Sequence, residues 1–158
     1  MEMPETTKRF VADAAALGLD VAPVVYPDGT KTAADAAAAI GCDVAAIVKS
    51  LLFMADDEPV LVLMAGDRRV DAKKLADLRG SAKSRRASLD EVRVHTGFVA
   101  GGTPPFCHPE PLPVLADNSL RRNESVWAAG GTPTTVFEID LDVLVDAAAA
   151  EWVSVAED

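Results

Sequence analysis

The stretch Ile47-Val48-Lys49-Ser50-Leu51-Leu52-Phe53-Met54, residues 47–54, is rich in β-branched and large apolar residues and predicts a β-strand. A second continuous apolar run, from Pro59 to Ala65, follows it closely. The acidic residues 56–58 between the two runs predict a hairpin connection. Neither run alternates cleanly with polar residues, so we expect both strands to be covered on two faces.

Helices are predicted on both sides of this hairpin by apolar periodicity and by capping residues. Thr32 with Asp35, and Ser88 with Glu91, have the spacing of residues that begin a helix. Glycines mark several of the expected helix ends. The expected elements are helices over about residues 6–17, 32–40, 71–80 and 141–152, a short helix after Ser88, and a turn at Tyr26 to Gly29.

After Gly97 the sequence changes to short apolar runs separated by tight, glycine-containing loops. We expect strands at 113–116, 126–129 and 134–139, and a helical turn at 120–125. Helices and strands therefore alternate irregularly, which predicts an α+β fold. The expected architecture is a single domain over residues 1–158, with a mixed, curved or barrel-like β-sheet flanked by helices.

Charge is distributed unevenly along the chain. The net charge of −10 argues against a general DNA or nucleic-acid binder, because such binding depends on neutralising phosphates. The segment from Arg68 to Arg93, however, carries nine basic and four acidic residues, and is therefore +5. This segment is either a solvated helix face with an exposed loop or a patch that binds a polyanion.

The sequence also indicates where the protein works. Its first ten residues include four charged side chains and form no apolar signal region. We find no run of about 18 apolar residues that could span a bilayer. A cytoplasmic location and no membrane partner are therefore expected. The two cysteines and two histidines give no convincing metal site, and no cofactor is expected.

Lys49 is the most unusual residue of the first strand. Alternation along the strand places it on the same face as Leu51 and Phe53, with Ser50 on the opposite face. Burying an unpaired ammonium group is costly, so Lys49 must meet an acid, a carbonyl or a ligand unless it reaches solvent at the strand edge. A fixed positive charge in a pocket could bind phosphate or polarise a carbonyl.

Two glycine-rich loops could form the rest of a site. In the loop Gly101-Gly102-Thr103-Pro104-Pro105, paired glycines can expose backbone N–H groups to a ligand and the prolines stiffen the exit. Gly130 and Gly131, followed by Thr132 and Pro133, repeat this chemistry. Either loop could equally be an ordinary turn.

Five further residues carry weaker signals. Cys107 and His108 are adjacent, and neighbouring side chains on an extended chain diverge, so a Cys–His catalytic pair is doubtful. Buried free thiols are the simplest interpretation of Cys42 and Cys107. Asp117 and Asn118 could line a pocket rim or form a turn.

Taken in order, these segments resemble the YbaK/prolyl-tRNA synthetase-associated domain family. The resemblance extends from about Thr6 to Leu144. Each motif alone is weak, but their combination in a domain of this length is fairly specific. The matching segments are residues 32–37 with 40–42, the segment 47–53, residues 96–98 leading to the loop 101–105, and residues 129–131.

The resemblance implies a mixed α/β domain that hydrolyses mischarged tRNA in trans, as an aminoacyl-tRNA deacylase. In the family, the strand lysine helps to hold the charged 3′ end and the loop positions the aminoacyl group. Those roles fall here on Lys49 and on Gly101 to Pro105, with Gly130 and Gly131 as further substrate-binding residues. Water or a group of the substrate attacks the ester, so no protein nucleophile is required.

The implied partners are the aminoacyl-tRNA 3′ end and, as a further candidate, an aminoacyl-tRNA synthetase. Cys107 and His108 occur where many relatives carry glycine, and residues 132–137 lack the basic character of the best-studied deacylases. Both departures bear on which small amino acid, such as Ala, Ser, Thr or Cys, is removed. The alternatives are a non-catalytic module that binds an RNA end or an aminoacyl-adenosine, and a thiol-dependent hydrolase.

Overall fold

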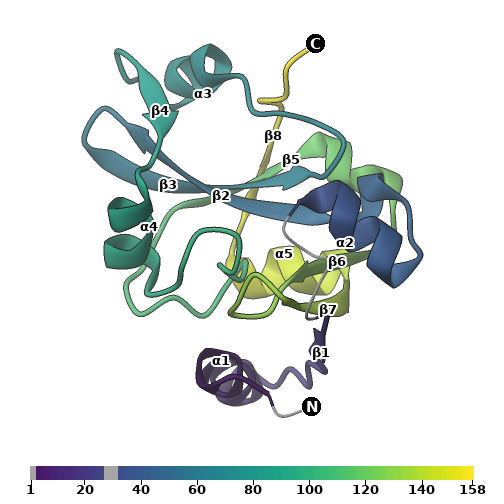
Figure 1. Cartoon of the computed structure of the whole chain (residues 1–158). Coiled ribbons are helices and arrows are strands. Elements are labelled where there is room, and N and C mark those ends of the chain that lie inside the picture. Colours follow the sequence, from purple (N-terminus) through teal and green to yellow (C-terminus); the bar gives the residue numbers. More distant parts are fainter. Residues whose placement is uncertain (1–2, 27–31) are drawn as a thin grey trace.

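The computed structural model describes residues 3–26 and 32–158, and Figure 1 shows its helices and strands. The helices are α1 (Glu5–Ala16), α2 (Ala33–Ile40), α3 (Ala72–Arg79), α4 (Leu89–Thr96) and α5 (Leu141–Ala148), with short 3-10 helices η1 (Val44–Ala46) and η2 (Asn118–Arg122). The strands are β1 (Val24–Val25), β2 (Val48–Ala55), β3 (Glu58–Ala65), β4 (Ser84–Arg86), β5 (Val114–Asp117), β6 (Ser125–Ala129), β7 (Thr135–Asp140) and β8 (Glu151–Val153).

The strands form two sheets. The larger sheet has the order β4-β2-β3-β5-β8 and is mixed: β2 is antiparallel to β3 and β4, whereas β5 is parallel to β3 and β8. The smaller sheet, β1-β7-β6, is antiparallel. A parallel bridge between Ile47 and Trp127 joins the two sheets without closing a barrel. The α+β class is confirmed, with the strands divided between two sheets rather than one.

The β2–β3 hairpin is the centre of the larger sheet, and β3 is buried on both faces as predicted. Leu61 and Leu63 pack into the core between the two sheets. Val62 and Met64 pack on the opposite face, in a second cluster with Leu75 of α3. A strand that is apolar at every position is suited to this place, because each face has an apolar partner.

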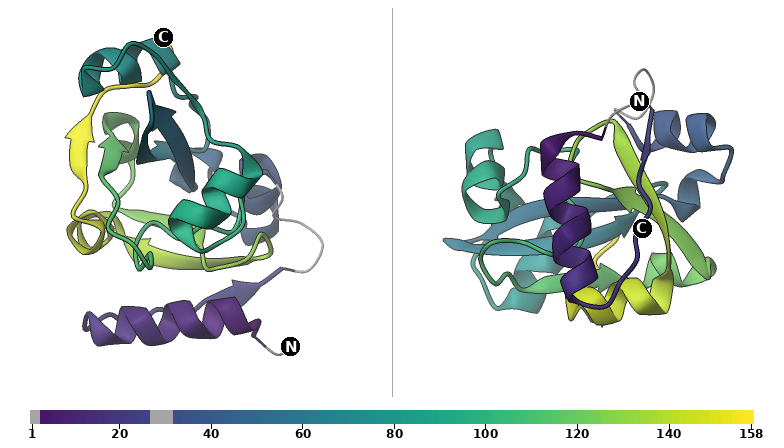
Figure 2. Two further views of the ribbon diagram at one scale, coloured as in Figure 1. Left: turned by 90° about the vertical axis from the view of Figure 1, so that its left-hand side faces the viewer. Right: turned by 90° about the horizontal axis from the view of Figure 1, so that it is seen from below.

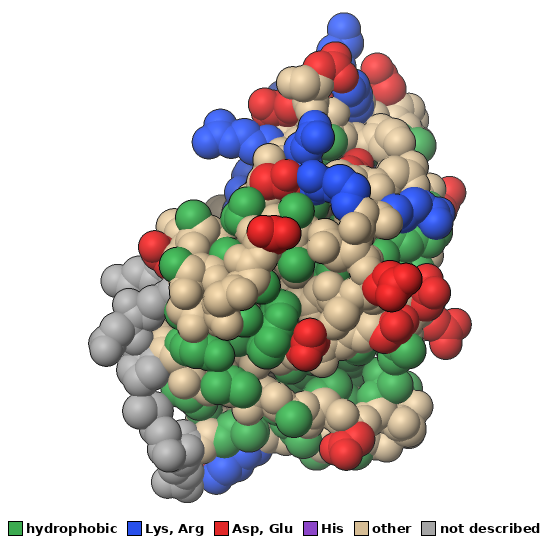
Figure 3. All heavy atoms as spheres, turned by 90° about the vertical axis from the view of Figure 1, so that its right-hand side faces the viewer, with side chains coloured by type: hydrophobic (Ala, Val, Ile, Leu, Met, Phe, Trp, Pro, Cys, Tyr) green, Lys and Arg blue, Asp and Glu red, His purple; other side chains and the backbone are tan. Residues whose placement is uncertain are grey.

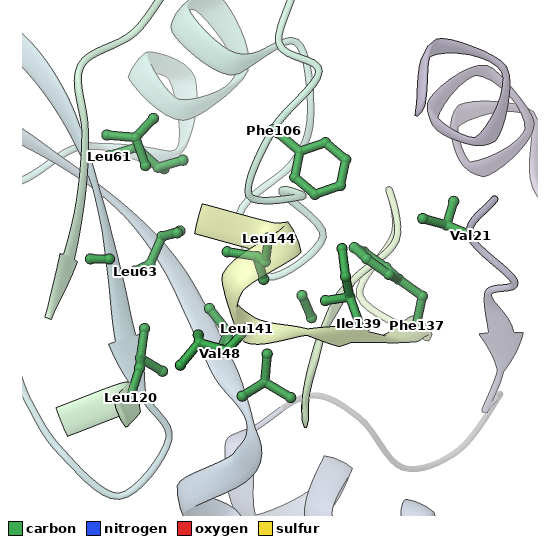
Figure 4. Packing of buried hydrophobic residues seen from close by; sticks show 14 of the residues in the cluster. Val21, Val48, Leu61, Leu63, Phe106, Leu120, Phe137, Ile139, Leu141 and Leu144 are labelled. Carbon is green, nitrogen blue, oxygen red and sulfur yellow. The ribbon is translucent and has the colours of Figure 1, made fainter. Parts of the chain in front are cut away.

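The main core lies between the two sheets and α5. Figure 4 shows Leu61 and Leu63 of the larger sheet opposite Phe137 of β7 and Leu144 of α5. Helix α1 lies beneath the smaller sheet, on the side away from the larger one (Figure 2). Its Phe10 contacts the rings of Phe106 and Phe137, with centroid distances of 5.4 and 5.1 Å.

The predicted helix starts are confirmed by their capping contacts. The Asp35 backbone N–H donates to Thr32 Oγ1 over 3.0 Å. Ser88 and Glu91 form a reciprocal capping box at the start of α4. The side chains of Asp71 and Asp140 accept backbone N–H groups at the starts of α3 and α5.

Three predictions need correction or lie outside the structure. The closing helix ends at Ala148, because the chain then turns at Ala149 and residues 151–153 pair with β5 as strand β8. The helical turn expected at 120–125 begins earlier, since Asp117 caps η2. Residues 27–29 of the turn predicted at Tyr26 to Gly29 lie outside the described residues. Within the described ranges, the helices are too short or too polar to cross a membrane.

Candidate functional site

A cavity of about 570 Å³ lies where β2 of the larger sheet meets β6 and β7 of the smaller one, and residues from both faces of β2 line it. Its walls come from α2, β2, the turn after β3, the segment 100–103, and strands β6 and β7. Its volume is within the range of small-molecule sites. Small apolar side chains line much of it, including Ala33, Ala36, Ala100, Ala128 and Ala129.

Lys49 lies half-buried in β2 and lines this cavity. Its Nζ donates a hydrogen bond to the backbone carbonyl of Arg68, so the ammonium group meets a carbonyl, one of the partners expected for it. The pKa of Lys49 is lowered first by burial and then by the nearby charges of Arg69 and Arg86, while Asp67 opposes the shift. The backbone carbonyl of Arg68 therefore fixes the position of the ammonium group, and the positive charges of Arg69 and Arg86 repel it.

Ser50 also lines the cavity, although it alternates with Lys49 along the strand. Its hydroxyl oxygen is buried and has no hydrogen-bond partner, the one such side-chain atom among the described residues. Buried polar atoms are nearly always hydrogen-bonded, and an unsatisfied one costs roughly 1–3 kcal/mol. Ser50 is therefore an energetic exception in the wall of this cavity.

The loop of residues 101–105 contributes Gly101 and Thr103 to the cavity. Thr103 is buried, and its hydroxyl donates to the carbonyl of Val99 over 3.1 Å. Gly102 packs so closely on the second loop that a Cβ atom at this position would lie 2.7 Å from the backbone of Thr132. The backbone N–H of Gly131 donates to the carbonyl of Gly102 over 3.0 Å and joins the two loops.

The second glycine loop packs closely against the start of the chain at Gly131. At Gly131 the φ angle is 111°, and a Cβ atom would lie 3.1 Å from the carbonyl oxygen of Thr6. Gly130 donates its backbone N–H to the carbonyl of Thr135. Of the predicted site residues, the cavity brings together Lys49, Gly101 and Thr103. The others do not line it: Gly102, Pro104, Pro105, Gly130 and Gly131.

Cys107 and His108 line a different cavity, together with Pro105, Arg9 and Asp13. Burial, and secondarily Asp13, raises the pKa of the Cys107 thiol to about 11. Burial also lowers the pKa of His108, whose Nε2 lies 2.8 Å from the carbonyl oxygen of Pro104. A thiol with a raised pKa is a poor nucleophile at neutral pH, so this pair does not form an activated nucleophile and base.

Known proteins resemble this chain in sequence and in fold. The family model of the aminoacyl-tRNA editing domain matches residues 27–147. The chain belongs to this family. The chain is also 33% identical over 114 residues to the uncharacterized protein YwhH of Bacillus subtilis (strain 168), which covers 71% of this chain and 72% of YwhH.

Two further relatives are named for prolyl-tRNA synthetase or for its editing. The proline–tRNA ligase of Aquifex aeolicus (strain VF5) is 36% identical over 112 residues, which are 70% of this chain but only 20% of the ligase. A crystal structure provisionally described as a trans-editing enzyme for prolyl tRNA synthetase has a TM-score of 0.93 and 35% sequence identity, and covers 99% of this chain and 100% of that one. The chain therefore belongs to a domain type related to prolyl-tRNA synthetase editing.

The editing domain also has cavity residues that were not predicted as site residues. Asp67, Arg68, Arg69 and Arg86 line the cavity with Lys49, as does the half-buried Trp127. The excess of basic residues over 68–93 was the available signal for the arginines. This excess of charge does not indicate whether Arg85 or Arg86 faces the cavity, because only the folded strand shows that Arg86 does.

Two other weak candidates have structural contacts in the editing domain. Asp117 is buried, where its carboxylate accepts from the backbone N–H groups of Ser119 and Val155. Asn118 donates to the hydroxyl of Ser154. Both residues thus hold the end of β5 against the segment after β8. Within residues 3–26 and 32–158, no group of three or more Cys, His, Asp and Glu side chains could hold a metal ion.

Proposed function

We propose that the protein is a trans-acting aminoacyl-tRNA deacylase that hydrolyses the ester bond of a mischarged tRNA. The observation that carries this proposal is the meeting of Lys49 with Gly101 and Thr103 in one cavity. Membership of the aminoacyl-tRNA editing domain family supports the substrate class. The small side chains that line the cavity support a small amino acid, such as Ala, Ser, Thr or Cys.

In the proposed reaction, a water oxygen attacks the ester carbonyl carbon, and the bond from that carbon to the ribose oxygen breaks. The acyl group keeps the water oxygen and the ribose oxygen takes a proton, so the products are a free amino acid and a tRNA with a free 3′-terminal ribose. Lys49 serves as a fixed positive charge at the tRNA end, and the loop of residues 101–105 positions the aminoacyl group. Catalysis by positioning and electrostatics needs no protein nucleophile.

The test is a panel of tRNAs charged with Ala, Ser, Thr or Cys, with initial hydrolysis rates measured above the buffer background. We expect the wild-type protein to hydrolyse at least one of them. Lys49→Ala should lower that rate about 100-fold or more, which is the scale of losing a well-placed electrostatic group. Circular dichroism on the same samples checks that the variant is folded.

Cys107→Ser is the matched control in the second cavity. Because the thiol is largely protonated there, this variant should hydrolyse the same substrate at the wild-type rate. Loss of activity in Cys107→Ser would favour a thiol-dependent hydrolase instead. A wild-type protein that binds the charged tRNAs but hydrolyses none of them would be a non-catalytic binding module, and the proposal would fail.

A further inference from the structure

Four cationic side chains line the cavity whose wall contains Lys49, and we call this set the basic mouth: Lys49, Arg68, Arg69 and Arg86. All three arginines are exposed. Figure 3 shows several Lys and Arg side chains over the upper part of the face on the α2 side, with Asp and Glu side chains among them and an area of hydrophobic side chains below. The feature is unusual in a chain with a net charge of −10.

Asp67, an acidic residue that lines the same cavity, is already paired with an arginine outside this set. Asp67 accepts two hydrogen bonds from the Arg122 guanidinium, over 2.6 and 2.8 Å. The same pairing lowers the pKa of Asp67, chiefly through its hydrogen bond with Arg122. Asp67 is therefore shared between Arg122 and the basic mouth, and it opposes only part of the positive charge gathered there.

Some other basic residues of the segment 68–93 form ion pairs with carboxylates. Arg85 makes a bidentate pair with Glu91, over 2.7 and 2.9 Å, and Lys74 pairs with Asp158. Arg86, the neighbour of Arg85, instead lines the cavity with its guanidinium 5.8 Å from the ring centre of Phe53. Among the described residues, neither Arg69 nor Arg86 has a carboxylate within ion-pair distance.

Like charges gathered without a counter-charge repel one another, so a bound anion would lower this electrostatic repulsion. Arginine is the side chain best suited to bind phosphate, because its planar guanidinium can donate two parallel hydrogen bonds. The interior beyond the basic mouth is lined largely by apolar residues, which suits a nucleoside and an aminoacyl group more than a second phosphate.

We infer that Arg69 and Arg86, together with Lys49, bind a backbone phosphate of the RNA strand whose 3′ end enters the cavity. The phosphate stays at the basic mouth, and the terminal aminoacyl-nucleoside lies inside. This inference rests on the proposed function for its choice of RNA. Arg69 and Arg86 are then phosphate-binding residues, and the RNA strand enters the cavity past them.

The experiment measures the salt dependence of binding to an uncharged RNA minihelix with a single-stranded 3′ end, by fluorescence anisotropy. Each of Arg69→Gln and Arg86→Gln should weaken binding about 3- to 10-fold near 0.1 M salt. Each should also reduce the slope of log K against log salt by about 0.7 to 0.9, as expected for one lost phosphate contact. Arg86→Lys keeps the charge and should keep the slope.

Two controls separate phosphate binding from other effects. Arg79→Gln removes the same charge from an exposed position of the same basic segment, outside the cavity, and should leave the slope unchanged. An adenosine carrying a 3′-aminoacylamide and no phosphate should bind all the variants as it binds the wild type. If the glutamine variants also weaken this analogue, they have distorted the cavity and the inference is overturned.

The remaining outcomes distinguish this inference from the proposed function. Unchanged slopes in both glutamine variants, with hydrolysis of a charged tRNA intact, would overturn the phosphate site and leave the deacylase. Reduced slopes in a protein that hydrolyses no charged tRNA would support the site and remove the deacylase. Tight binding of orthophosphate alone, at constant ionic strength, would overturn the assignment to an RNA strand.

Discussion

The cavity at Lys49 and the cavity at Cys107 share the loop of residues 101–105, which gives Gly101 and Thr103 to the first and Pro105 to the second. In the first cavity, cations crowd together and the Ser50 hydroxyl has no partner. In the second, burial raises the pKa of Cys107 and lowers the pKa of His108, so both groups favour their neutral forms. The cavity suited to a polar ligand is therefore the one with unpaired cations and an unbonded hydroxyl, and not the one that contains a thiol and an imidazole.

Gly102→Ala should have the largest effect on stability, because the loop that the two cavities share depends on close packing. The new Cβ atom would lie 2.7 Å from the backbone of Thr132, which cannot rotate away as a side chain could. We expect the free energy of unfolding to fall by about 1–3 kcal/mol, the usual scale of overpacking. Thermal unfolding of the purified variant measures the change.

Gly130→Ala is the matched control for that substitution. Its Cβ atom would lie 3.4 Å from the Cβ atom of Pro23, an ordinary contact, so the loss should stay below about 1 kcal/mol. Equal losses in the two variants would mean that the close approach of the loops does not determine the stability of this region.

The lowered pKa of Lys49 in the first cavity should be visible in the pH dependence of hydrolysis. Because burial and two arginines lower the pKa of Lys49, its ammonium group loses its proton at a lower pH than an ordinary lysine, whose pKa is 10.5. We expect kcat/KM, corrected for spontaneous ester hydrolysis, to fall on the alkaline side at a pH below that value. The free energy of unfolding should rise over the same window, since the unfolded chain binds this proton more tightly.

Lys49→Arg tests the origin of this alkaline fall. A guanidinium group stays charged throughout the range, so any activity that the variant retains should be independent of pH there. An alkaline fall of the same midpoint in Lys49→Arg would assign it to another group.

The smallest effect is expected for Ser50→Ala. Its buried hydroxyl makes no hydrogen bond in the described part of the chain, so removing it should leave the free energy of unfolding unchanged or raise it by up to about 1 kcal/mol. Thr103→Val, which removes a buried hydroxyl that is bonded to Val99, should instead lower stability by about 1–2 kcal/mol. Denaturant unfolding compares the two, and a clear loss in Ser50→Ala would mean that this hydroxyl has a stabilising partner.

Much of the fold could be predicted from local signals. The continuous apolar runs of β2 and β3 and the capping residues Thr32, Asp71 and Ser88 are short-range features, and each predicted its element correctly. Strands β1, β4 and β8 were not predicted, because two or three residues carry no periodicity. Their positions depend on pairing with strands far away in the sequence.

The site could be predicted only in part, for the same reason. Lys49 was identifiable as a charge within an apolar strand, whereas Arg69 and Arg86 enter the cavity through the turn after β3 and the edge strand β4. The glycines of both loops were expected to expose backbone N–H groups, whereas those of Gly102, Gly130 and Gly131 donate to backbone carbonyls within the chain. Their packing against Thr132 and Thr6 depends on contacts between distant segments, which a single sequence does not reveal.

The origin of the cavity walls has a consequence for biosynthesis. Among the described residues, the lining extends from Thr32 to Val136 of β7, with contributions from segments between them. A chain that grows from its N-terminus cannot form this cavity until β7 has been synthesised and has paired with β6. The ribosome therefore adds more than a hundred residues, from the first wall segment to the last, before the nascent protein could recognise any ligand there.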